Sequence, residues 1–185
     1  AADSTNQDLA DLWDEFWRSP DVTGEIPGTE LERMICRSWL RDGEVFIQHI
    51  PRTAPAGSLA YSLMPLESDF VPFDLIEPKS GTVHGVIKDR FGRPTAYHVY
   101  TEHPGDSATS MLGAGLYPET VIVGAANMTH LKFTRRLHQT RGVSVLHAVL
   151  TRLDDLKEYE ESERVAARIA AAFSAYIKRN GDYSS

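Results

Sequence analysis

The chain has 185 residues, enough for one domain with a real core, and its 42% apolar and 24% charged residues are values typical of a globular protein, not a disordered one. Its net charge of −7 argues against a general nucleic-acid binder, and its single cysteine excludes an internal disulfide. The single cysteine therefore fits a reducing compartment. Neither a membrane-spanning apolar run of ~20 residues nor a signal peptide is found.

Two amphipathic helices are expected at the N-terminal end. Apolar residues on one stripe predict a helix over 6–18; they are Leu9, Leu12, Trp13, Phe16 and Trp17. This stripe packs either in the domain's own core or against a neighbouring subunit. Thr29 and Glu32 form a capping box that predicts a second helix ending at Gly43. On that helix, Cys36 is expected to be a small buried hydrophobe.

From Glu44 the hydrophobic period changes to two, which predicts strands. The expected strands are 44–50, 59–66, 73–77, 83–88, 95–101, 120–123 and 129–133. The first two should pair antiparallel, and 83–88 with 95–101 form the clearest hairpin, where Gly92 is free to take positive φ. Residues 103–118 are expected to form an exposed, mobile loop.

The last predicted element is a helix from Ser144 to Arg179, marked by a helical stripe of apolar residues. At 1.5 Å per residue it would be roughly 50 Å long. A compact domain of this size cannot cover such a helix fully. The helix therefore either breaks near its acidic stretch at 158–163 or packs against other chains.

Together these patterns predict an α+β protein. It has a small, mostly antiparallel sheet or partial barrel, N-terminal helices and a long C-terminal helix. A single domain is expected over 1–185, with a helical part at 1–43, a β-rich part at 44–133 and the long helix at 144–179.

The sequence offers little for catalysis. None of its seven histidines stands in metal-ligand spacing, and neither a nucleophile elbow nor a phosphate-binding loop is found. His84 and His98 could face each other across the hairpin, which leaves a metal-dependent hydrolase as a remote alternative. His130 is expected to be packed and hydrogen-bonded. We therefore predict no catalytic, cofactor-binding or metal-binding residues and no enzyme activity.

The charges fall in blocks along the chain. Residues 128–152 hold five bases and no acid, whereas residues 154–163 hold six acids and one base. Such blocks suit a subunit that meets copies of itself through complementary patches, although plain solvated faces explain them too.

Six short motifs follow one another along the chain. They are Asp11–Trp13, Arg41–Glu44, Leu75–Pro78, Gly85–Tyr97, Thr140–Gly142 and Leu153–Glu160. Each is weakly specific alone, but in this order and spacing they resemble the lambda-type family of tailed-bacteriophage portal proteins. Members of that family are much longer, and this chain resembles a fragment that covers their wing region.

The resemblance implies a structural subunit of a portal, the head–tail connector ring through which phage DNA is packaged and ejected. It implies a ring of usually twelve copies at the capsid vertex of the virion, assembled in the host bacterial cytoplasm. The implied partners are the chain itself, terminase, capsid and tail-connector proteins, and double-stranded DNA that passes without sequence-specific binding; no membrane and no cofactor is implied.

A ring needs head-to-tail interfaces between complementary patches. The candidate interface residues are Arg135, Arg136, Arg141, Glu158 and Glu161. A local role is the alternative for Arg141, which could pair with a nearby carbonyl or carboxylate. The rival to a portal is a non-enzymatic adaptor or scaffold domain.

Overall fold

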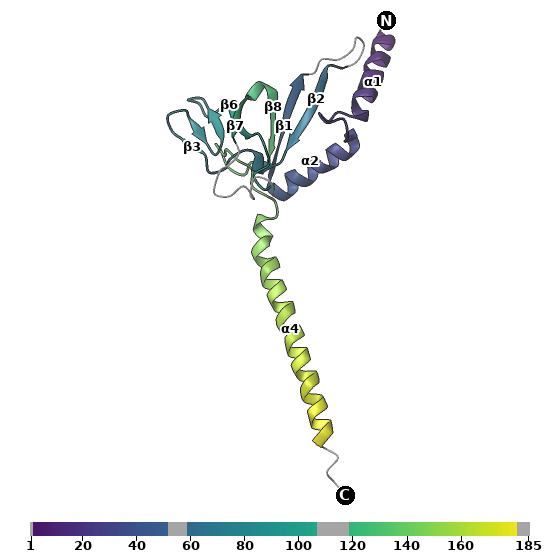
Figure 1. Cartoon of the computed structure of the whole chain (residues 1–185), viewed down its shortest axis with the longest axis vertical. Coiled ribbons are helices and arrows are strands. Elements are labelled where there is room, and N and C mark those ends of the chain that lie inside the picture. Colours follow the sequence, from purple (N-terminus) through teal and green to yellow (C-terminus); the bar gives the residue numbers. More distant parts are fainter. Residues whose placement is uncertain (1, 52–58, 107–118, 181–185) are drawn as a thin grey trace. The chain divides into compact units, whose positions relative to one another are not determined.

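The computed structural model describes residues 2–51, 59–106 and 119–180 (Figure 1). Contacts within the chain divide it into two compact units, Ala1–Val145 and Leu146–Ser185. The single domain over 1–185 stays a prediction. Most of the expected mobile loop, from residue 107 to its end at 118, lies outside the described residues.

Two helices open the first unit, as predicted. They are α1 (Ala2–Arg18) and α2 (Gly28–Asp42). The predicted capping box at Thr29 is wrong, because α2 begins one residue before it: the N–H groups of Glu30 and Leu31 already donate to Pro27 O at 3.0 and 2.9 Å, and no side chain caps the helix. The predicted end at Gly43 is confirmed by a φ of +86° and a hydrogen bond from its N–H to Trp39 O.

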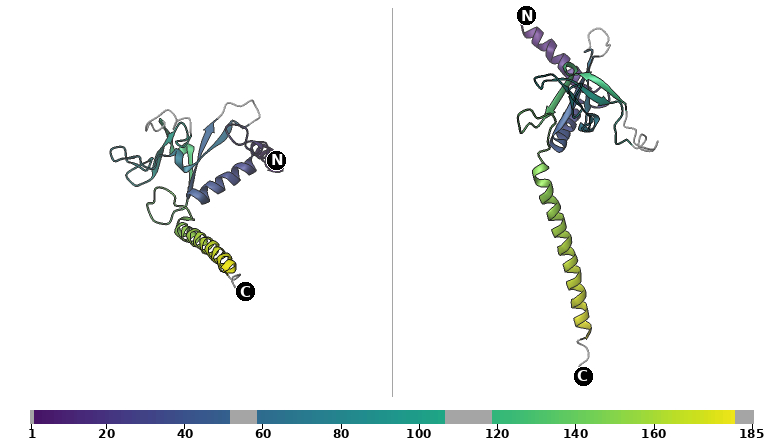
Figure 2. Two further views of the ribbon diagram at one scale, coloured as in Figure 1. Left: turned by 60° about the horizontal axis from the view of Figure 1, so that its bottom comes forward. Right: turned by 90° about the vertical axis from the view of Figure 1, so that its left-hand side faces the viewer.

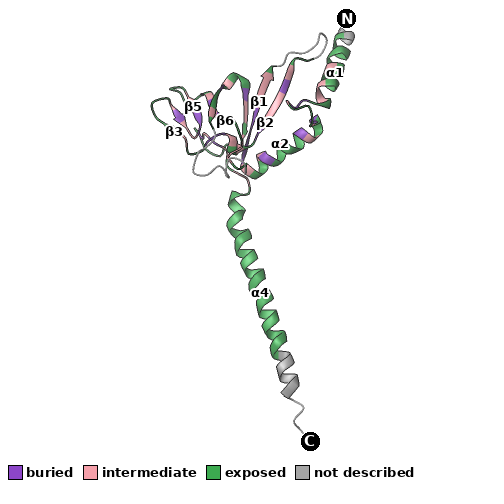
Figure 3. Cartoon of the chain, in the orientation of Figure 1, coloured by how far each residue is buried: buried purple, intermediate pink, exposed green. Residues whose placement is uncertain are grey.

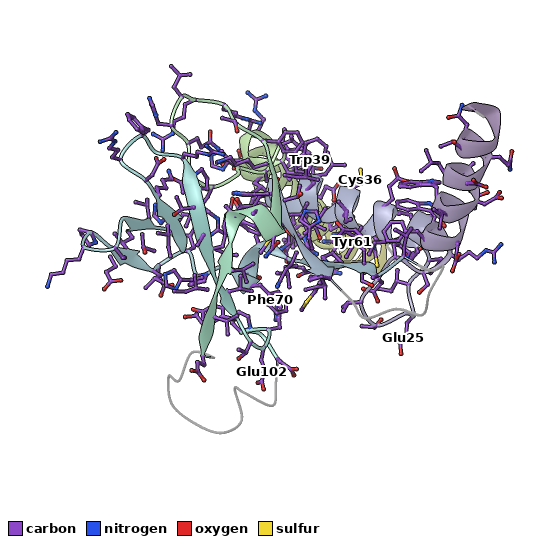
Figure 4. The ribbon with its side chains drawn as sticks, turned by 90° about the horizontal axis from the view of Figure 1, so that it is seen from above. Glu25, Cys36, Trp39, Tyr61, Phe70 and Glu102 are labelled. Atoms are coloured by element: carbon purple, nitrogen blue, oxygen red, sulfur yellow. The ribbon has the colours of Figure 1, made fainter. Side chains whose placement is uncertain are left out.

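The apolar stripe of α1 is covered at only one end. Phe16 packs on Tyr61 with ring centroids 5.8 Å apart (Tyr61 is labelled in Figure 4), and the ring of Trp17 lies so close to Gly28 that a Cβ there would come within 2.3 Å of it. Trp13 and Leu9, nearer the N-terminus, stay 55% and 60% exposed. The domain's own core therefore takes the C-terminal half of the stripe and leaves the rest in solvent.

Cys36 is exposed, so the expectation of a buried thiol is wrong. The buried side of α2 carries Gly28, Leu31 and Ser38. Cys36 is five residues after Leu31, which at 100° per residue turns it well away from that side. In Figure 4 Cys36 and Trp39 are both labelled on this helix.

A three-stranded antiparallel sheet has β1 (Glu44–Pro51) at its centre, with β2 (Tyr61–Leu66) on one side and β8 (Met128–Lys132) on the other. The predicted antiparallel pairing of the first two strands is confirmed. Phe46 lies opposite Leu66 on one neighbour and His130 on the other. In the two views of Figure 2, α2 runs beside this sheet.

A second sheet of five antiparallel strands follows chain order. Its strands are β3 (Ile76–Glu77), β4 (Thr82–Val83), β5 (Val86–Lys88), β6 (Pro94–Tyr100) and β7 (Thr120–Gly124). The predicted strand 73–77 is shorter than expected, since only its last two residues pair. The predicted strand 83–88 is interrupted, because His84 and Gly85 take φ values of +53° and +76° and form a two-residue hairpin turn between β4 and β5. Its predicted hairpin with 95–101 is confirmed for Val86–Lys88, which pair antiparallel with β6.

Both sheets contribute to one core (purple segments in Figure 3). Its buried members are Phe46, Leu66, Val71, Val86, Tyr97, Val99, Val123 and Met128. The predicted α+β class is confirmed, with antiparallel sheets that form no closed barrel in the described part of the chain.

The second unit is the helix α4 (His147–Asn180). Of the two alternatives for this helix, the break at 158–163 is wrong, because the helix is continuous and contains neither Gly nor Pro. Every described side chain from 147 to 173 is exposed, so its acidic groups are solvated and screened rather than forced together. No helix within the described ranges is both long and apolar enough to span a membrane.

Candidate functional site

Three charged or titratable side chains meet inside the first unit. Glu44 opens β1, His130 lies on the neighbouring strand β8, where it is paired with Phe46, and Arg141 follows in the segment after β8. Arg141 Nε donates to Glu44 Oε1 at 2.6 Å, and His130 Nε2 lies 2.8 Å from Glu44 Oε2. Their side chains are only 4–5% exposed. This buried charge cluster joins the strand that begins the β region to the segment that ends it.

Arg141 also reaches backbone carbonyls in three separate places. Its Nη1 donates to Val71 O and His84 O, and its Nη2 donates to Ser68 O, each at 2.9 Å. One guanidinium therefore ties the turn before β5 and the 68–71 segment to β1. A planar fork of donors can do this, whereas a lysine ammonium cannot span so many fixed acceptors.

The cluster is arranged to keep Glu44 ionised. Burial by itself raises the pKa of a carboxyl group, but the hydrogen bond from His130, the charge of Arg141 and the N–H of Gly142 together hold the pKa of Glu44 below its usual value. Burial lowers the pKa of His130, against the pull of Glu44. At neutral pH His130 is therefore an uncharged imidazole that donates to the carboxylate.

The cluster predicts that the free energy of unfolding falls as the pH falls. Below the ordinary histidine pKa of 6.5, the unfolded chain takes up a proton on residue 130 that the folded chain does not, and below 4.5 the same holds for residue 44. Stability that is present above these values is therefore lost on acidification, by at most about 1.4 kcal/mol per pH unit for each proton. Urea unfolding curves between pH 8 and pH 4 measure this.

The His130→Gln variant is the control for that prediction, because glutamine keeps a donor for the carboxylate but does not titrate. Its free energy of unfolding should depend less on pH between 6.5 and 5 than that of the unaltered protein. Equal slopes in the two proteins would contradict a buried, neutral His130.

Two glycines let the segments that carry this cluster cross. A Cβ on Gly142 would lie 2.1 Å from Gly43 O, and a Cβ on Gly43 would lie 2.2 Å from the carbonyl carbon of Val143. The backbones therefore touch directly, and the N–H of Gly142 donates to Glu44 Oε2 at 2.6 Å. Gly142 is needed for this close approach.

A pocket of about 360 Å³ opens beside the cluster, lined in part by Ser68, Asp69, Phe73 and Asp74. Glu44 and Arg141 also line this pocket, but they are hydrogen-bonded to each other and to backbone groups. Within the described residues no three His, Cys, Asp or Glu side chains are placed to hold a metal ion. The arrangement can hold strands together; it offers no activated nucleophile or base.

The segment 134–138 forms a second, open concavity of about 510 Å³. The buried Gln139 organises it: its Oε1 accepts from the N–H groups of Arg135 and Arg136, and its Nε2 donates to Phe133 O and Arg141 O. Lys132 Nζ donates to the carbonyls of Gln139 and Thr140 at 2.9 and 2.8 Å. The loop backbone is thus fixed while its outer side chains face solvent.

The β5–β6 turn lies next to this loop. A Cβ built on Gly92 would be 4.0 Å from His138 Nδ1. Asp89 Oδ1 accepts the N–H groups of Phe91 and Arg93, both at 2.9 Å, and the Arg90 guanidinium carbon lies 4.6 Å from the centre of the Phe91 ring. We call the exposed side chains of these two loops the arginine tip; they are Arg90, Phe91, Arg93, Arg135, Arg136 and Leu137.

The predicted site residues fall in three different places. Arg135 and Arg136 are exposed on the arginine tip, and Glu158 and Glu161 are exposed on α4 in the second unit. Arg141 is 6% exposed and paired within the chain, which favours its local role. Their joint role at a subunit interface stays a prediction. The prediction for His130 is confirmed by its hydrogen bond to Glu44 and its stacking on Phe46, with ring centroids 4.1 Å apart.

Sequence reasoning predicted the hairpin but did not single out Glu44, or the arginines of the turn at Arg90–Arg93, as site residues. Nothing local marks Glu44 as buried, since a carboxylate at the start of a strand is ordinarily solvated. For the turn, a signal existed: Asp89-Arg90-Phe91-Gly92-Arg93 is a hairpin loop whose aspartate can bond its own backbone, which leaves the arginines outside.

In the described residues, buried Glu44 and Arg141 pair with each other, buried Asp21 accepts hydrogen bonds from Thr23, and the apolar stripe of α4 is exposed. These features are typical of the class of structural proteins that work by assembly. The family model for the phage portal proteins of the lambda family matches residues 1–185, and the chain belongs to that family. It is 26% identical over 166 residues to a probable portal protein of Halomonas phage phiHAP-1. That match covers 88% of this chain and 31% of the relative, so the chain spans about a third of the relative's length.

Proposed function

We propose that this chain is the wing-region part of a portal subunit, and that copies of the full-length protein form the ring through which phage DNA enters and leaves the capsid. The observation that carries the proposal is the match to the lambda portal family along the whole chain. The motifs that suggested the family from the sequence run from Asp11 to Glu160 and so sample the same length.

The helix α4 supports self-assembly on physical grounds. Its apolar stripe is uncovered, with Leu150, Leu153 and Leu156 between 52% and 55% exposed. A helix within a protein owes most of its stability to the packing of its apolar face. A helix of 34 residues with that face bare is therefore expected to be covered by other protein, as it would be in a ring of subunits.

The place and partners of the ring follow from the same proposal. The ring occupies a capsid vertex in the virion, is assembled in the bacterial cytoplasm, and meets terminase, capsid and tail-connector proteins. Double-stranded DNA passes through it without sequence recognition. The net charge of −7 suits such a passage, because an acidic protein gains little from displacing counterions at the phosphates.

Electron microscopy of the purified full-length protein tests the proposal. We expect closed rings, usually of twelve subunits, with a central opening. Phage particles made without the protein should lack packaged DNA. A protein that stays monomeric at high concentration, or phage that package DNA normally without it, would overturn the proposal and favour an adaptor or scaffold domain.

The structure gives no support to a hydrolase on the histidine hairpin. His84 sits in the β4–β5 turn, where its Nδ1 lies 2.6 Å from Phe73 O, while His98 lies on β6 opposite Ile122. Among the described residues, neither histidine belongs to a group of three His, Cys, Asp or Glu side chains placed to hold a metal ion. Metal analysis of the purified protein would reveal a bound transition metal if this conclusion were mistaken.

A further inference from the structure

We propose that the arginine tip of one subunit seats on the acidic stretch of α4, residues 154–163, in a neighbouring copy of this chain. The inference rests on the proposed assembly into rings. Compared with the interface residues expected from the sequence, the proposed contact leaves out Arg141 and adds the β5–β6 turn.

The tip is a fixed shape, which favours binding because little order has to be created on contact. Asp89 closes one loop through two backbone hydrogen bonds, and Gln139 closes the other through four. Lys88 Nζ donates to the Thr140 hydroxyl and so ties the second loop to β5. A preorganised loop pair loses less conformational entropy on binding than a floppy one.

The chemistry of the tip calls for a partner that is both acidic and apolar. Four arginines stand against the one carboxylate of Asp89. Between them, Phe91 is 74% exposed and Leu137 is 88% exposed, among the most exposed large apolar side chains in the described residues. Arginine and aromatic side chains are the residues most often found to anchor protein interfaces.

The α4 stretch offers matching groups. Six acids and one base occupy 154–163, and Leu153, Leu156 and Tyr159 lie 54%, 52% and 63% exposed on the same length of helix. Duplex DNA would satisfy the arginines, but its outer surface is a charged phosphate backbone, and its apolar groups, the thymine methyls, lie in the grooves. The two exposed apolar groups therefore favour a helix of this kind over a nucleic acid.

Charge reversal and charge exchange test the contact in the full-length protein. Arg135→Glu with Arg136→Glu, and separately Glu158→Lys with Glu161→Lys, should each weaken self-association by about tenfold or more, because opposed charges become like charges. Combining all four changes should restore most of the association. Arg18→Glu with Arg37→Glu, two exposed arginines on α1 and α2, is the matched control and should have no effect. Sedimentation velocity measures the assembly, and far-ultraviolet circular dichroism checks the fold.

A photo-crosslinking residue placed at position 137 gives a second readout that needs no charge change. Unlabelled protein that carries it is mixed with isotope-labelled protein that lacks it, and crosslinked peptides are identified by mass spectrometry. Crosslinks from position 137 to labelled peptides within 150–165 are the expected result.

Each other outcome overturns the proposal. In the crosslinking experiment, such outcomes are crosslinks confined to unlabelled chains or crosslinks elsewhere on the neighbour. In the charge-reversal experiment, they are variants that assemble unchanged. A filter-binding assay adds one more: charge-reversed protein that still assembles but retains less DNA. Rings that still form while position 137 crosslinks elsewhere would overturn this contact and leave the portal function standing. Absence of rings from the unaltered protein would overturn the portal function itself.

Discussion

Replacing Arg141 with methionine is expected to lower the free energy of unfolding by about 3–5 kcal/mol. The substitution removes the cation from a carboxylate that is only 4% exposed and leaves Glu44 with an uncompensated buried charge. It also removes the donors for Val71 O, His84 O and Ser68 O. Chemical denaturation at pH 7 measures the loss.

Arg135→Met is the matched control, since it removes the same kind of side chain from an exposed position in the same segment. Its effect on stability should stay within about 0.5 kcal/mol. Adding Glu44→Gln to Arg141→Met removes the stranded charge, so the double variant should be more stable than the sum of the two single losses predicts. A loss below about 1 kcal/mol for Arg141→Met alone would show that the cluster does not hold the sheets together.

Elements with a strong period were predictable from the sequence. The apolar stripe from Leu9 to Trp17 predicted α1, and the alternation from Glu44 predicted β1. The apolar helical stripe after Ser144 predicted α4. In each case the apolar residue types repeat with the period of the element. Part of that apolar face is buried within the chain in α1 and β1, whereas the stripe of α4 is exposed.

The wrong predictions lie where competing local signals were nearly equal. Thr29 and Glu32 fit a capping box, but packing of Trp17 against Gly28 and acceptance by Pro27 O start the helix earlier. The pair His84-Gly85 reads as part of an apolar strand, yet it turns because glycine tolerates positive φ and histidine is among the residues that tolerate it best.

The exposed part of the site could be predicted from the sequence, but of the buried part only His130, as a packed and hydrogen-bonded side chain, and a local pairing of Arg141 could be expected. Arg135 and Arg136 are adjacent in the sequence and are recognisable there as a basic pair. Glu44 and Arg141, in contrast, are separated by 97 residues and meet only because β1 and the segment after β8 cross. A pairing of that kind follows from the topology of the whole sheet. The neighbouring turn at Arg90–Arg93 joins the tip for the same reason.

Gly142→Ala is the second substitution with a large expected effect, a loss of about 2–3 kcal/mol in the free energy of unfolding. The added methyl group would lie 2.1 Å from Gly43 O and 2.7 Å from Glu44 Cβ. Neither atom is the end of a flexible side chain, so the two backbones must separate, and overpacking of this kind costs about 1–3 kcal/mol. Separation would also lengthen the hydrogen bond from Gly142 N–H to Glu44, now 2.6 Å, which adds to the loss.

Gly124→Ala is the control, because a Cβ there meets no atom within 4 Å and its φ of −64° suits any residue. That substitution should be neutral or raise stability by up to about 1 kcal/mol, through the smaller entropy of the unfolded chain. If thermal unfolding shows both alanine variants to be equally stable, the backbones at Gly43 and Gly142 do not touch. The buried charge cluster would then lack the crossing that brings Arg141 to Glu44.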